Sequence, residues 1–79
     1  MSGDPHAFAV EKLERVFGPA RAATLLADVL RELHRDRIDS PQALHDAGVI
    51  LERRGGIEAG VGAILKVQAV LRSRDVKGA

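Results

Sequence analysis

The chain has 79 residues and a mass of 8.5 kDa, enough for one small domain but not for two. It contains no cysteine, which excludes disulfides, thiol nucleophiles and cysteine-ligated zinc. The 12 Lys and Arg residues stand against 11 Asp and Glu, a net charge of +1 that is far from the strongly basic balance of a dedicated nucleic-acid-binding domain.

Two helices are expected in the first half of the chain. Residues 5–17 form the first, because Asp4-Pro5 supplies a capping acid followed by proline and Gly18-Pro19 ends the helix. Residues 19–35 form the second, and we expect its end to fray over residues 34–37. Its apolar stripe is wider than a coiled-coil seam. The stripe consists of Ala22, Leu25, Leu26, Val29, Leu30 and Leu33.

Two further helices are expected in the second half. Residues 41–54 follow Ser40-Pro41, again a capping residue before a proline. Gly48 lies inside this helix at a cost of about 1 kcal/mol relative to alanine, so a break into two short helices stays open. Residues 57–73 form the fourth helix after Gly55-Gly56, with apolar residues broadly on one side. That side consists of Ile57, Val61, Ile64, Leu65, Val67 and Leu71.

The fold class follows from these four segments. No window of the sequence alternates apolar and polar residues as a half-buried strand would. The sequence therefore predicts one all-α domain over residues 1–79, a small four-helix bundle or an orthogonal helical array. The uncharged run at residues 59–65 is far shorter than the ~20 residues of a membrane helix. Residues 1–6 do not resemble a secretory signal, so we expect a cytoplasmic protein that makes no membrane contact.

No catalytic or metal-binding pattern is present. His6, His34 and His45 lack the spacing of a zinc-binding helix, so no metal site is expected. The glycine-rich residues 55–62 precede a helix, but a phosphate loop also needs a preceding strand and a Gly-Lys-Ser/Thr sequence. No nucleophile, base and acid occur at a recognisable spacing. We therefore expect a protein that is not an enzyme and that has no cofactor.

Basic residues gather at the expected ends of three helices, within residues 31–37, 53–54 and 72–77. Positive charge at a helix C-terminus complements the helix dipole, worth about 0.3–1 kcal/mol per charge. This effect explains the clusters without a ligand. If the first and third clusters met at one rim of a bundle, they would instead form a basic edge for phosphates.

A resemblance to a nucleic-acid-binding element lies near the start of the fourth helix. Ala59-Gly60-Val61-Gly62, followed by an apolar helix with Lys66, resembles the helix-hairpin-helix element of DNA-binding proteins. The resemblance implies a double-stranded DNA-binding domain. The backbone amides of Gly60, Val61 and Gly62, with the Lys66 side chain, would then bind a DNA phosphate.

Other parts of the chain extend this resemblance but also depart from it. Residues 16–22 are similar to a second copy of the element, and residues 40–44 are similar to the helix that links two copies. Lys66, however, stands where the family has a small residue, and the earlier copy has one glycine instead of two. The alternative interpretation is that Gly60 and Gly62 allow two helices to pack closely.

The size of the chain favours association with another helix. A domain this small stabilises itself with disulfides, metals or self-association, and the first two are not expected here. Several apolar residues also lie off the expected core stripes. We expect Phe8, Val49, Val67 and Val70 to be exposed on the monomer and covered in a complex. The sequence therefore predicts a non-enzymatic protein–protein interaction or self-association module, forming a homo-oligomer or binding a helix of a partner protein.

Overall fold

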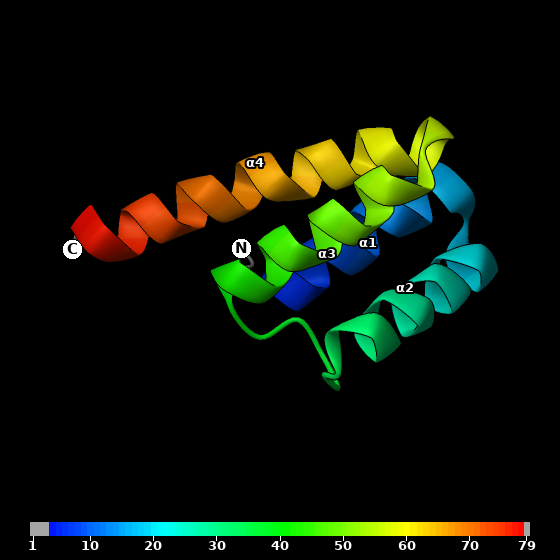
Figure 1. The fold of residues 1–79 in the computed structure, drawn as a ribbon, viewed down its shortest axis with the longest axis horizontal. Helices are drawn as coiled ribbons and strands as arrows, with labels where there is room; N and C mark the ends of the chain where they lie inside the picture. Colours follow the sequence, from blue (N-terminus) through cyan, green and yellow to red (C-terminus); the bar gives the residue numbers. More distant parts are fainter. Residues whose placement is uncertain (1–3, 79) are drawn as a thin grey trace.

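The computed structural model describes the backbone of residues 4–78 and the side chains of residues 4–73. Over this part of the chain there are four helices and no strand: α1 (Pro5–Phe17), α2 (Pro19–Leu33), α3 (Pro41–Arg54) and α4 (Gly56–Gly78). The all-α prediction is confirmed. Figure 1 shows α4 running antiparallel to α3 along one edge of the molecule, with α2 on the opposite side. The α4 helix packs mainly on α3, whereas α2 packs on α1 and α3.

The helix starts follow the local signals in the sequence. The Asp4 side chain accepts a hydrogen bond from the N–H of His6 at 3.0 Å and caps α1. The Ser40 hydroxyl oxygen accepts one from the N–H of Ala43 at 3.1 Å and caps α3. In both helices a proline follows the cap, where its missing N–H is not needed.

The ends of α2 and α4 differ from the expected ones, and the break in α3 that the sequence left open does not occur. The α2 helix ends at Leu33, because His34 adopts a left-handed conformation with φ 58°. The N–H of Arg35 then donates to the carbonyl of Leu30 at 3.1 Å, which is a Schellman stop rather than fraying. The α3 helix continues through Gly48 without a break. The α4 helix extends to Gly78, beyond the expected end at residue 73.

The core draws apolar residues from all four helices and one from a loop. Fully buried large side chains include Leu13 of α1, Leu44 of α3 and Leu65 of α4. Ile38, in the connection between α2 and α3, is also fully buried. Its backbone N–H donates to Nδ1 of His6 at 3.0 Å, so the start of α1 holds this connection in place. No pattern of helical periodicity predicts a core residue in a loop.

Close contact between α3 and α4 depends on two glycines. A Cβ atom on Gly48 would lie 2.6 Å from the carbonyl oxygen of Gly62, and a Cβ on Gly62 would lie 2.5 Å from the carbonyl oxygen of Gly48. The two backbones therefore touch at a point where no side chain fits. Gly48 lies in an unbroken helix because its absent side chain makes this contact possible.

Candidate functional site

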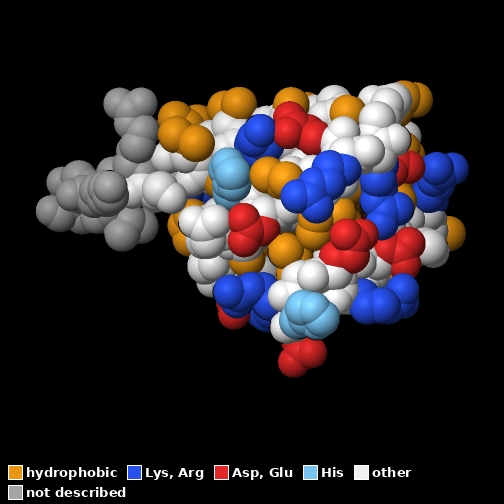
Figure 2. All heavy atoms as spheres, viewed as in Figure 1, with side chains coloured by type: hydrophobic (Ala, Val, Ile, Leu, Met, Phe, Trp, Pro, Cys, Tyr) orange, Lys and Arg blue, Asp and Glu red, His pale blue; other side chains and the backbone are white. Residues whose placement is uncertain are grey.

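The most distinctive surface of the molecule is an exposed apolar face on α4. Its large side chains are between 47% and 70% exposed. They are Ile57, Ile64, Val67, Val70 and Leu71. Gly60 and Ala63, both also exposed, lie among them. We call these seven residues the outer α4 face, and Figure 2 shows hydrophobic side chains along this edge of the molecule.

The spacing on the outer α4 face is that of a helix-packing seam. Ile57, Gly60, Ile64, Val67 and Leu71 follow one another at alternating steps of three and four residues. This spacing keeps residues on one side of a helix and matches the a and d positions of a coiled coil. Ala63 and Val70 each precede an a position and widen the seam on one side.

The α4 helix is apolar on both sides, but the rest of the chain covers only one. Val61, Leu65 and Ala69 are buried in the core, on the side of α4 opposite the outer face. A helix that is hydrophobic all round is normally buried all round. Lys66 is the sole charged residue between Ala59 and Leu71. Its Nζ lies 2.8 Å from Glu52 Oε1 of α3, so its charge is held at the α3 side.

Two of the four predicted interface residues belong to this surface. Val67 is 61% exposed and Val70 is 49% exposed, as expected. Phe8 and Val49 are half-buried instead, and the expectation that both are exposed is corrected. The Phe8 ring packs against the core. Two cations also lie over the ring, Lys12 Nζ at 5.3 Å and Arg72 Cζ at 5.4 Å from its centroid.

Sequence periodicity alone predicts that the other large residues of the outer α4 face lie in the core. That periodicity puts Ile57, Ile64 and Leu71 on one side with Val61 and Leu65. The structure separates them, because Val61 and Leu65 face α3 while the other three are exposed. The sequence does contain a signal for this division, which is the occurrence of apolar residues around the whole circumference of α4.

The residues of the helix-hairpin-helix resemblance lie inside α4. The turn between α3 and α4 is at Gly55-Gly56, and the N–H of Ala59 already donates to the carbonyl of Gly55 at 3.2 Å. Gly60, Val61 and Gly62 follow in the helix, where N–H groups bond to the preceding turn.

The other features of that resemblance are used within the fold. Val61 is 3% exposed, and Gly62 packs on Gly48. The ammonium of Lys66 is paired with Glu52. Gly62 matches the alternative of close helix packing, but Gly60 does not, because it is exposed and nothing lies within 4 Å of an added Cβ. The helix does not present a row of backbone amides to a phosphate.

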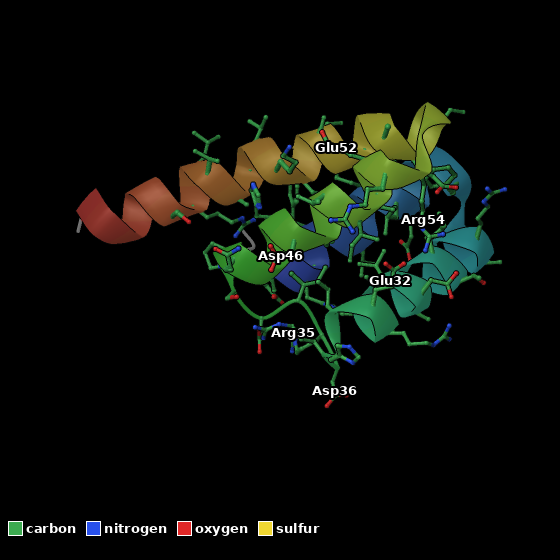
Figure 3. All side chains as sticks on the ribbon, in the orientation of Figure 1. Glu32, Arg35, Asp36, Asp46, Glu52 and Arg54 are labelled. Carbon is green, nitrogen blue, oxygen red and sulfur yellow. The ribbon has the colours of Figure 1, made fainter. Side chains whose placement is uncertain are left out.

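The basic clusters at the helix ends are largely paired with acids. Figure 3 shows Arg54 of α3 and Glu32 of α2, whose Nη2 and Oε2 atoms lie 3.1 Å apart. Three further arginine–aspartate pairs have N–O distances of 2.7–3.2 Å. They are Arg31–Asp28, Arg35–Asp39 and Arg37–Asp4. The side chains of residues 74–77 lie outside the described residues, so the expected basic rim is not part of the described surface.

One shallow hollow lies between the start of α2 and the turn between α3 and α4. Its lining includes Arg21, Thr24, Arg54 and Glu58. Both arginines are paired, Arg21 with Glu58 at 3.4 Å and Arg54 with Glu32. The hollow therefore offers no concentrated charge of either sign to a ligand.

Metal-binding clusters and membrane-spanning helices are both missing from the part of the chain that the structure describes. Among these residues, no three His, Asp or Glu side chains gather closely enough to hold a metal ion. Over the same residues, no helix combines the length and apolar composition needed to cross a membrane.

No protein-family model, curated protein or solved structure matches this chain. A function is therefore inferred from the chain's own surface, and above all from the outer α4 face.

Proposed function

We propose that this chain is a non-enzymatic protein-interaction module that binds an apolar helix along the outer α4 face. The observation that carries the proposal is a continuous apolar seam, from Ile57 to Leu71, that no other part of the described chain covers. Covering apolar surface gains about 25 cal/mol per Å², so leaving the seam in water is costly for a domain with a small core.

The shape of the seam favours a helix as its occupant. At 1.5 Å per residue, the stretch from Ile57 to Leu71 is about 21 Å long, which matches four turns of a partner helix. Steps of three and four residues leave holes between the large side chains, and a helix with the same spacing fills them. An extended peptide would bring backbone N–H and C=O groups onto a helix surface that offers them no partners.

The surroundings of the seam are suited to docking. Figure 1 shows α4 along one edge of the molecule, with α3 on its inner side, so an incoming helix can approach without meeting α2. The ion pairs at the helix ends lie elsewhere, and exposed charges of this kind influence orientation and solubility more than affinity.

The test compares two valine-to-aspartate variants with similar exposure in the parent chain. Val70 is 49% exposed on α4 and Val16 is 46% exposed on α1. We expect Val70→Asp to abolish association, because a buried unpaired charge costs several kcal/mol. We expect Val16→Asp to leave association unchanged. Circular dichroism checks that both variants keep their helices.

Two measurements are made on each variant. Sedimentation velocity at several concentrations gives the native mass. Fluorescence anisotropy gives the binding of a labelled peptide with the sequence of residues 56–73, which is an apolar helix of the required spacing. A wild-type chain that is monomeric and does not bind this peptide contradicts the proposal, as does a Val70→Asp variant that behaves like wild type.

A further inference from the structure

We infer that the helix best suited to the outer α4 face is α4 of a second copy of this chain, packed antiparallel to the first. The inference rests on the proposed function and names the partner of the same surface. It comes from the order of small and large side chains along the seam, which is complementary to itself when the direction is reversed.

Ile64 and Leu71 are a positions of the seam, and Gly60 and Val67 are d positions. In an antiparallel pair of helices, the a positions of one helix lie opposite the d positions of the other. With the two-fold axis between Ile64 and Val67, Ile64 of each copy packs against Val67 of the other. In the same register Gly60 lies opposite Leu71, so the position without a side chain receives the larger leucine. On the flank, the small Ala63 lies near Val70 of the second copy. Each small residue is thus matched by a larger one.

A parallel arrangement lacks this match. It would place Gly60 opposite Gly60 and Leu71 opposite Leu71, which leaves a gap at one layer of the seam. Gaps of this kind forfeit contacts that a filled layer would make. Antiparallel packing also brings the positive end of each helix dipole near the negative end of the other. Because the seam itself carries no charge, electrostatic repulsion does not oppose this arrangement.

The size of the contact predicts a weak, reversible dimer. Covering five large side chains that are about half exposed removes on the order of 500 Å² per copy, so a symmetric pair buries on the order of 1,000 Å². This is near the lower limit for a specific interface. A two-fold contact closes on itself, so the assembly stops at two copies.

The absence of cysteine from the sequence makes disulfide trapping a direct test. Gly60→Cys and Leu71→Cys are prepared separately, mixed in equal amounts and oxidised. Gly60 tolerates the change, since nothing lies within 4 Å of an added Cβ. We expect the mixed disulfide, which joins position 60 of one variant to position 71 of the other, to exceed both self-disulfides at least tenfold. In the proposed register two copies of position 71 are about 16 Å apart along the axis, beyond the roughly 4.4–6.8 Å Cα separation of a disulfide.

A control and four opposing outcomes complete the test. Val16→Cys, exposed on α1, is expected to form only background disulfide. If disulfides between two copies of position 71 dominate, the antiparallel arrangement is overturned. If all disulfide species form in equal amounts, a defined register is overturned. A wild-type chain that stays monomeric but binds the residue 56–73 peptide would overturn the second copy as partner while leaving the proposed function standing. A monomer that does not bind the peptide would overturn both.

Discussion

Gly48 of α3 and Gly62 of α4 lie in reciprocal contact, so that a Cβ on either residue would lie within 2.6 Å of the other's carbonyl oxygen. Each glycine lowers the intrinsic stability of its own helix by about 1 kcal/mol relative to alanine. The close approach of α3 and α4 offsets that cost, because apolar side chains of both helices, including Leu51 and Leu65, are fully buried.

Replacing one of these glycines should therefore destabilise the fold despite a gain in helix propensity. We expect Gly62→Ala to lower the free energy of unfolding by about 1–3 kcal/mol, the usual range for overpacking. Gly60→Ala, two residues earlier on the same helix, should raise the free energy of unfolding of the monomer, measured at low protein concentration, by up to about 1 kcal/mol, because its Cβ meets nothing within 4 Å in a single chain. Urea denaturation of both variants gives the comparison. Equal stability of the two would contradict the close contact at Gly62.

The hydrogen bond from Ile38 to His6 should matter more than its place in a connecting loop suggests. Removing the acceptor in His6→Ala leaves a partly buried N–H without its partner, at a cost of about 1–3 kcal/mol. His6→Asn offers a side-chain oxygen near the position of Nδ1 and should retain much of the stability. Hydrogen exchange of the Ile38 amide is the specific readout. If the Ile38 amide is equally protected in His6→Ala and in wild type, the result argues against the hydrogen bond.

Acid should weaken the link between α1 and the connection that precedes α3. Desolvation acts to raise the pKa of Asp4, but the N–H of His6 and the Arg37 guanidinium outweigh it and hold the pKa below the usual 3.8. A carboxyl with a lowered pKa stabilises the fold above its unfolded-state pKa and loses this effect as pH falls through its folded-state pKa. We expect Asp4→Asn to be less stable than wild type at pH 7.

The difference between Asp4→Asn and wild type should shrink as pH falls below about 3.8. Asparagine keeps an oxygen that can cap α1, so the variant isolates the loss of charge opposite Arg37. Asp36→Asn changes an exposed carboxylate in the same connection and serves as the control. Chemical denaturation over pH 2–7 measures all three proteins. A gap between Asp4→Asn and wild type that stays constant with pH would count against the charge pair.

Lys66 should contribute more through its aliphatic stem than through its charge. Its Cγ would lie 2.7 Å from a Cβ on Gly48, so the stem covers that glycine, while its ammonium pairs with Glu52. Lys66→Met keeps the stem and should lower the free energy of unfolding by about 1 kcal/mol or less, the usual limit for an ion pair near the surface. Lys66→Ala removes both the stem and the charge and should lower the free energy of unfolding further. Thermal denaturation measures both variants, and a larger loss in Lys66→Met than in Lys66→Ala would reverse this assignment.

The unfolding midpoint should depend on protein concentration. A dimer of native chains is favoured at high concentration, so mass action raises the midpoint as the wild-type concentration increases. Val70→Asp should show a constant midpoint over the same range, whereas Val16→Asp should follow wild type. Thermal melts over a hundredfold range of concentration provide the measurement. A midpoint of the wild-type chain that does not change over that range would contradict dimer formation.

The sequence by itself determined where three of the four helices begin. Asp4-Pro5, Gly18-Pro19 and Ser40-Pro41 act on neighbouring backbone groups, and the structure starts α1, α2 and α3 at these prolines. Such signals are legible because caps and prolines exert their effects within one turn of helix. The all-α class followed from the four segments that these signals bound and from the absence of any alternating, strand-like window.

Only the tertiary structure decided which apolar residues are covered. Ile38 is buried in a connection whose N–H the start of α1 binds, and Phe8 is half-buried because its ring packs against the core, with Arg72, far away in sequence, lying over it. Periodicity could not choose between the two apolar sides of α4. Both sides carry a glycine, Gly60 on one and Gly62 on the other, and the fold places Gly62 against Gly48 of α3. That contact buries Val61 and Leu65 and leaves the outer α4 face exposed.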